Sequence, residues 1–203
     1  MKEELTFRIQ VTSCAFGRLR KGVFDSHDLS VSTKITVYNK CLMPLLVYRS
    51  KTWTLYQHEV KQLRTIQQRH PRQTLNIKRD DYISNEEVLR HADVEDIEVK
   101  LVRVRLRWLG HACRIKEDRP VKELLYCELA HGSRPVGRPM KLGVMDTSKT
   151  ALKCGHVLDQ CSSTVSNRAE WKRLTRVVCD ASNSKRVREY EKRRAPRRAE
   201  QRT

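Results

Sequence analysis

The sequence predicts a mainly α-helical protein with two helical segments, over residues 1–75 and 76–130, and a poorly ordered basic part beyond them. In the first 130 residues, apolar side chains recur at the three- and four-residue spacing of a helix face. Two stretches begin with a polar residue followed three positions later by an acidic one, as at a helix start. After residue 130 apolar residues become sparse. We therefore expect residues 131–184 to form a Gly/Pro linker with one weak helix, and residues 185–203 a basic disordered tail.

The first segment is expected to open with two short helices. One covers about Ile9–Lys21, and a turn follows it. The other covers Thr33–Met43 and can be capped by Ser30 or Ser32, whose hydroxyls accept hydrogen bonds from free amides of a first turn. Pro44 is expected to disturb or end this helix, because proline has no amide hydrogen to donate.

A third helix is predicted from about Tyr56 to Arg72, and it has a basic face. Its apolar positions are spaced for one buried side: Val60, Leu63 and Ile66. From Lys61 to Arg79 there are six basic residues and no acidic one. The candidate nucleic-acid contacts on this helix are Lys61, Arg64, Arg69 and Arg72.

The second segment contains two expected helix starts. Ser84 and Glu87 have the spacing of a capping box, which opens a short helix to His91. Asp93 with Asp96 repeats the pattern and predicts a long helix that runs to about Ile115.

The long helix is predicted to be apolar on two sides. On a helical wheel one stripe is Ile97, Leu101, Val104, Trp108 and Ile115. The roughly opposite stripe is Val102, Leu106, Leu109 and Cys113. A helix of this kind packs between two layers. A cationic row runs between the stripes: Lys100, Arg103, Arg107 and Arg114. These side chains either contact a phosphate backbone or pack their aliphatic parts over the edge of the core.

The C-terminal part is predicted to be extended and basic. Residues 131–145 carry three glycines and two prolines, which is typical of a linker or arm. A weak helix is expected near Arg168–Cys179, and the tail after it has nine basic and three acidic residues from Lys185 onward. The candidate nucleic-acid contacts in this part are Arg134, Arg138, Lys192, Arg193, Arg194, Arg197 and Arg198.

The charge of the chain indicates a polyanionic partner. Lys and Arg number 42 against 24 Asp and Glu, a formal net charge of +18. Nucleic acid is the usual partner of such an excess, because each neutralised phosphate releases a condensed counterion. An acidic membrane surface is less suited, since no basic amphipathic stretch ends in an apolar anchor. A merely solvated basic surface remains open. We expect sequence-nonspecific RNA or DNA as partner, no membrane and no small-molecule substrate.

Other features predict an intracellular protein, nuclear or cytoplasmic. The first ten residues, MKEELTFRIQ, have no apolar core of a signal peptide. The seven cysteines are odd in number and scattered, which indicates reduced thiols. The longest apolar run, Cys41–Tyr48, is too short to span a bilayer.

Several runs along the chain together resemble a known family. They include LLVYRSKTWTL at positions 45–55 and LRWLGHACR at positions 106–114. The others, in chain order, are Cys14–Leu19, Thr33–Ile35, Leu75–Lys78, Ser84–Leu89, Gly132–Pro139 and Asn167–Lys172. In this order and spacing they are similar to the region after the polymerase palm in LINE-type non-LTR retrotransposon endonuclease/reverse transcriptases. The resemblance implies a thumb-like helical segment over residues 1–75, followed by a nucleic-acid-associated region.

The sequence departs from the family pattern at some positions. Arg49 stands where the family usually has Gly, and Lys51 where it has Glu. Residues 140–144 replace the usual basic and aromatic run after "GRP". These departures are typical of a decaying copy.

The chemistry of the parent family is expected to be absent. Nucleotide polymerisation needs clustered carboxylates that hold two divalent metal ions. The only Asp-Asp pair is Asp80-Asp81, which we interpret as a polar turn. The endonuclease domain, which the family places upstream, is also expected to be absent. We therefore expect no catalytic residues, no cofactor and no enzyme activity.

A metal site is also not expected. No C-x-x-C pair occurs, and the groups Cys154, His156, Cys161 and Cys127, His131 do not have zinc-finger spacing. His111 is interpreted as a packing histidine.

The sequence thus predicts a catalytically incomplete remnant of a reverse transcriptase that retains at most nonspecific RNA or DNA binding. The alternatives are a host-adopted interaction protein or a pseudogene-like product without function. A third possibility is an active polymerase whose palm comes from another chain.

Overall fold

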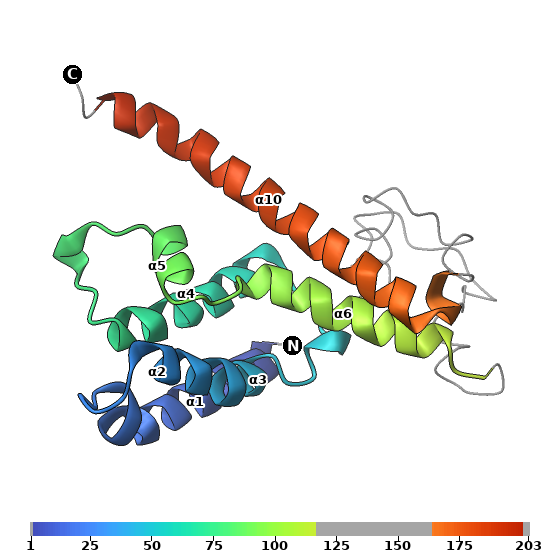
Figure 1. Ribbon diagram of the computed structural model, residues 1–203, viewed down its shortest axis with the longest axis horizontal. Helices are drawn as coiled ribbons and strands as arrows, with labels where there is room; N and C mark the ends of the chain where they lie inside the picture. Colours follow the sequence, from blue (N-terminus) through green and yellow to red (C-terminus); the bar gives the residue numbers. More distant parts are fainter. Residues whose placement is uncertain (1, 117–163, 201–203) are drawn as a thin grey trace. The chain divides into compact units, whose positions relative to one another are not determined.

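In the computed structural model, residues 2–116 and 164–200 are described, and these contain helices and no strands (Figure 1). The predicted all-helical class is confirmed. The chain divides into two compact units, Met1–Lys100 and Leu101–Thr203, and the boundary falls inside helix α6. In chain order the elements are α1 (Lys2–Leu19), η1 (Arg20–Phe24), α2 (Val31–Val37), η2 (Tyr38–Leu42), α3 (Met43–Leu46), η3 (Ser50–Thr52), α4 (Gln57–Thr74), η4 (Arg79–Asp81), α5 (Asn85–His91), α6 (Ile97–Cys113) and α10 (Arg168–Glu200).

Helix α1 begins seven residues earlier than the sequence predicted. Leu5 in its second turn is buried, so the additional turns have a packing partner. Glu3 and Glu4 lie in the first turn, where negative charge is favourable to the helix dipole. Glu4 also pairs with Arg8 one turn later, at 2.8 Å between Oε1 and Nε.

Pro44 does not end the second helical stretch. Ser30 caps α2, as one of the two predicted candidates, by accepting a bond from the Thr33 amide. The chain then widens into the π-helical turn η2 and continues as α3. Pro44 lies in the first turn of α3, where a missing amide hydrogen costs little. The helical stretch therefore passes through a π-helical turn just before the proline and continues to Leu46.

A stack of rings forms part of the core of the first unit. His70 of α4 lies parallel to Phe16 of α1, with ring centroids 4.3 Å apart. Phe24 stacks on Phe16 at 4.6 Å, and the edge of Tyr38 meets His70 at 5.9 Å. Burial, together with the charge of Arg69, lowers the pKa of His70 to about 4, so the ring is neutral at pH 7. The stack joins four elements, and no sequence pattern predicted it.

The capping box at the start of α5 is confirmed. The Ser84 hydroxyl accepts from the Glu87 amide at 3.3 Å, and Glu87 accepts from the Ser84 amide at 2.9 Å. The second predicted box is wrong. Asp93 has φ 47° and lies in the loop, whereas Asp96 accepts from the Glu98 amide through its side chain and from the Lys100 amide through its carbonyl.

A buried glutamine ties this loop to α4. Gln67 donates from Nε2 to the Glu95 carbonyl at 2.6 Å and accepts from the Ile97 amide at 2.9 Å. Residues 76–97 therefore belong with α4 in the first unit. The segment boundary near residue 75 stays a prediction, and the two compact units divide between Lys100 and Leu101.

The second unit is built around α6 and α10. Its core is Leu106, Leu109, Val165, Trp171, Leu174 and Val178, with Val102 and Cys113 packed against it. The predicted second apolar stripe of α6 is thus the face that packs on α10. On the other stripe, Trp108 is half-buried and not a fully enclosed core residue.

Helix α10 is longer than the sequence predicted. The weak helix expected to stop near Cys179 continues to Glu200 and takes in most of the segment assigned to a disordered tail. The charge of that segment suggested disorder, but Lys, Arg and Glu are favourable helix formers. The predicted linker at 131–145 lies outside the described residues.

Candidate nucleic-acid interface

Trp171 fixes the contact between α6 and α10. Its indole is buried, and Nε1 donates to the Leu106 carbonyl at 3.1 Å. Gly110 lies directly against this ring, because a Cβ built on it would overlap the indole and stand 2.7 Å from Cε2. The absence of a side chain at Gly110 therefore allows the close approach of the two helices.

Two contacts fix where α10 begins. Asn167 caps the helix, since its Oδ1 accepts from the amides of Ala169 at 3.0 Å and Glu170 at 3.3 Å. Arg114, just after the end of α6, donates from Nη1 to the Val165 carbonyl at 3.0 Å. The end of α6 therefore lies beside the start of α10, and the two helices run antiparallel (Figure 1).

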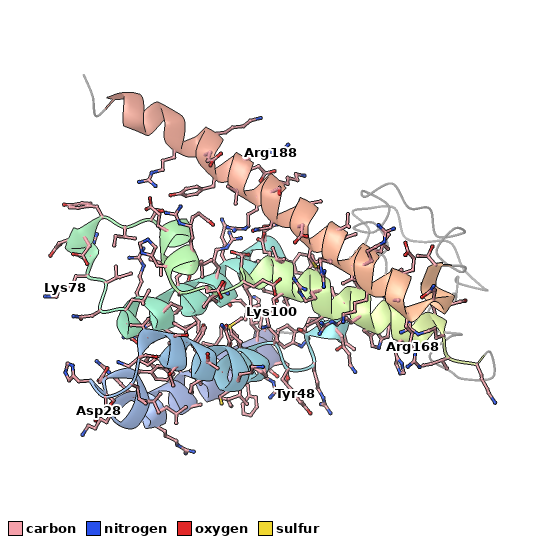
Figure 2. All side chains as sticks on the ribbon, viewed as in Figure 1. Asp28, Tyr48, Lys78, Lys100, Arg168 and Arg188 are labelled. Atoms are coloured by element: carbon pink, nitrogen blue, oxygen red, sulfur yellow. The ribbon has the colours of Figure 1, made fainter. Side chains whose placement is uncertain are left out.

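A groove of about 420 Å³ lies along this helix pair, and we call it the basic groove. Residues four apart share one face of a helix, so each helix presents one row of side chains to the groove. Arg168, at the start of α10, is labelled in Figure 2. The α6 side contributes Arg103, Arg107, His111 and Arg114, and the α10 side contributes Arg168, Trp171, Lys172, Thr175 and Arg176.

The basic groove is strongly cationic. Six of its nine lining residues are Arg or Lys, and none is acidic. Gathering like charges around one volume is unfavourable unless an anion or counterions occupy it. The nearby carboxylate of Glu170 forms an ion pair with Arg173, which does not line the groove, with the Oε1–Nη2 distance 2.5 Å. The Thr175 hydroxyl donates to the Trp171 carbonyl at 2.8 Å. Charge, and not neutral hydrogen bonding, is therefore the main feature the groove offers to a ligand.

Three of the predicted contacts meet in the basic groove. They are Arg103, Arg107 and Arg114, from the cationic row of the long helix. Arg107 is exposed, whereas Arg103 and Arg114 are half-buried. The bond from Arg114 to Val165 gives that arginine a structural role as well. The fourth member of the row, Lys100, does not line the groove.

The predicted basic face of α4 is divided between surface and internal contacts. Arg64 pairs with Glu98 at 3.0 Å and with the buried Asp96 at 3.6 Å. Arg72 donates to the Ile83 carbonyl at 2.7 Å and to Asn85 Oδ1 at 2.9 Å. The exposed cations of this helix are Lys61 and Arg69. The structure thus gives two of the four residues partners within the protein.

The remaining predicted contacts are placed only in part. Lys192 is exposed on α10, and Arg194 donates to the Tyr190 hydroxyl at 3.2 Å. The side chains of Arg193, Arg197 and Arg198 lie outside the described residues, as do Arg134 and Arg138 altogether.

The α10 row of the groove was missed by the sequence analysis. Arg168, Lys172 and Arg176 follow one another at four-residue intervals, which is a visible signal for one helix face. His111, interpreted as a packing residue, is exposed and lines the groove.

Asp80 and Asp81 lie in the 3₁₀ turn η4, where Asp81 accepts from the Lys78 amide at 2.7 Å. Within residues 2–116 and 164–200, no three His, Cys, Asp or Glu side chains are grouped so that they could hold a metal ion. The cysteines and histidines considered for zinc, between residues 127 and 161, lie outside the described residues. No helix in the described part of the chain is long and apolar enough to cross a membrane.

Comparison of the chain with known protein families, with curated proteins and with solved structures finds no match. The geometry of the basic groove therefore stands as the main guide to function.

Proposed function

We propose that this protein binds RNA and DNA without sequence preference through the basic groove. The observation that carries the proposal is the convergence of two cationic rows on one volume that no acidic side chain lines. A phosphate backbone provides a line of negative charges that matches such rows, and its binding is favoured by counterion release. The net charge of +18 supports the same class of partner.

We further propose that the chain is a catalytically incomplete remnant of a retrotransposon reverse transcriptase. This part of the proposal is supported by the ordered sequence resemblance and by the lack of a palm-like carboxylate cluster in the sequence. The purified protein is expected to incorporate no nucleotides on a primed RNA template with magnesium. Incorporation above that of a control preparation without the protein would contradict the proposal.

The binding proposal is tested by fluorescence anisotropy with labelled nucleic acids of unrelated sequence, measured over a series of salt concentrations. We expect similar affinities for each sequence and a steep loss of affinity with salt, because the interaction is with phosphates. The variant Arg103→Gln/Arg107→Gln should keep the fold, since Gln has a helix propensity similar to that of Arg. Each lost phosphate contact should make the logarithmic salt slope on duplex shallower by about one unit.

The matched control removes two cations from the surface of the first unit, in the variant Lys40→Gln/Arg90→Gln. Both side chains are exposed and lie outside the basic groove. We expect this variant to bind as the unchanged protein does. No binding at low salt, or binding that is independent of salt, would instead favour an interaction protein or a chain without function.

A further inference from the structure

The two cationic rows can contact the same stretch of a ligand. Because α6 and α10 are antiparallel, Arg114 and Arg168 stand at one end of the groove, and Arg103 and Arg176 stand toward the other. The axes of packed helices are about 8–10 Å apart, a distance that arginine and lysine side chains span from both sides. Side chains of both rows line one volume of about 420 Å³. A ligand strand lying there has cations on two sides.

The length of the groove fits a short piece of backbone. From residue 103 to residue 114 a helix rises about 16 Å, and each step of four residues rises about 6 Å. This step is close to the separation of adjacent phosphates along one nucleic-acid strand. A strand along the groove therefore places about three phosphates between the two rows.

A single strand can use both rows, whereas a duplex can use them only in part. In a duplex, each backbone has the paired bases on one side. The basic groove of the protein can therefore contact the phosphates of a backbone only from the side that faces away from the bases. The two backbones of B-DNA are themselves separated by grooves about 6 and 12 Å wide, so the two cationic rows cannot both follow one backbone closely. A single strand has no such obstruction, and cationic grooves that follow the backbone are typical of proteins that bind single strands.

The basic groove offers little ring surface on which a base can stack, namely the exposed imidazole of His111. The large ring of the lining, that of Trp171, is only 4% exposed, and its indole N–H is already bonded to the Leu106 carbonyl. Proteins that hold single strands commonly combine cations with exposed aromatic rings. Here six cations line the groove beside a single exposed ring, so the lining favours contacts with phosphates over contacts with bases.

From this geometry we propose that the basic groove binds single-stranded nucleic acid in preference to duplex, and that it contacts the phosphodiester backbone and not the bases. This inference rests on the proposed nucleic-acid binding of the same groove. DNA and RNA strands share the phosphate chemistry, so the preference applies to both.

The test uses the full chain and four labelled probes of equal length: oligo(dT), oligo(U), an abasic DNA strand and a blunt DNA duplex. We expect oligo(dT) and oligo(U) to bind more tightly than the duplex. The abasic strand should bind as tightly as oligo(dT). A probe that needs base contacts would instead lose affinity when its bases are removed. Circular dichroism of every variant checks that the helices remain folded.

The variant Arg107→Gln/Lys172→Gln removes one cation from each row. On single strands both removed cations contact phosphates. The slope of log K against log salt concentration should therefore become shallower by about 1.4, that is, roughly 0.7 for each lost phosphate contact. On duplex only one row is engaged, and the slope should change by no more than about 0.9. The control Lys40→Gln/Arg90→Gln should leave both slopes unchanged.

The outcomes separate this inference from the proposed function. Equal or tighter binding of duplex, or a marked loss with the abasic strand, would overturn the single-strand inference and leave nucleic-acid binding in place. Equal slope changes on both substrates would also overturn it. Failure of all four probes to bind would overturn both proposals.

Discussion

The arginines of the two units have opposite surroundings. In the first unit, Arg64 reaches Asp96 and Glu98, and Arg72 bonds to a carbonyl and an amide oxygen of the α5 region. In the second unit, six cations line one groove, and none of the nine residues that line it is acidic. Basic side chains of the first unit therefore bond within the fold, whereas those of the second unit converge on one volume that a ligand can enter, although Arg114 also bonds to the Val165 carbonyl. A count of basic residues along the sequence does not distinguish these two uses.

The units also differ in how their cores are held. The first unit distributes its core over several helices and includes the His70 ring stack and the Gln67 hydrogen bonds. The described core of the second unit depends on one helix pair, with Trp171 at its closest contact. We therefore expect a single substitution to affect the second unit more strongly than the first.

The largest effect is expected for Trp171→Ala. Loss of a buried tryptophan costs about 3–5 kcal/mol in unfolding free energy, because a large apolar side chain is removed and a cavity remains. Urea denaturation followed by circular dichroism measures the loss. The control Trp171→Phe keeps a ring and loses the bond to the Leu106 carbonyl, so it should cost less. A loss below about 1 kcal/mol for the alanine variant would contradict the assigned role of Trp171.

The next largest effect is a loss of unfolding free energy in the first unit as the pH falls. The folded-state pKa of His70 is about 4, below the unfolded value of 6.5, so the unfolded chain binds a proton more readily than the folded one. The contribution of the neutral ring is complete above pH 6.5 and is lost as the pH falls toward 4. The loss amounts to about 3 kcal/mol from the difference in pKa.

Urea unfolding at a series of pH values between 7 and 4 tests this loss. His70→Phe keeps an aromatic ring in the stack and removes the titrating group, so its stability should vary less over the same range. An equal pH dependence in the two proteins would show that other groups are responsible.

A smaller loss is expected for Gln67→Ala. This substitution leaves the Glu95 carbonyl and the Ile97 amide without their side-chain partner, at a cost of about 2 kcal/mol. The neighbouring Gln68 is also buried, but its Oε1 has no hydrogen-bond partner. Thermal unfolding should show a smaller change for Gln68→Ala, and a larger one would contradict the role assigned to Gln67.

The smallest effect tests whether the arginines of the two units differ in role. Arg64→Gln removes the partner of two carboxylates and should lower the unfolding free energy by about 1 kcal/mol, since its ion pair is only partly shielded from water. Arg107→Gln should leave stability unchanged or raise it, because like charges in the groove are separated. Nucleic-acid binding, measured by fluorescence anisotropy, should respond in the opposite way. Arg107→Gln should weaken binding, and Arg64→Gln should leave it unchanged. Equal effects of both substitutions on stability would remove the distinction between the units.

The sequence was sufficient for the local features of the fold. The all-helical class, the Ser84 capping box and the stripe of α6 that packs on α10 follow from spacing within a few residues. Three members of the groove, Arg103, Arg107 and Arg114, were named from their position on one helix face. The α10 row had the same spacing signal and was missed because the helix was expected to be weak.

What the sequence by itself determined is therefore which residues share a helix face, because the helix repeat depends only on neighbouring backbone geometry. The tertiary structure decided which faces meet. Whether Arg64 finds a carboxylate depends on Gln67 holding the loop around residue 95 against α4. Whether the two cationic rows converge depends on Trp171 fitting against Gly110. These contacts join residues far apart in the chain, and only packing in three dimensions brings their side chains together.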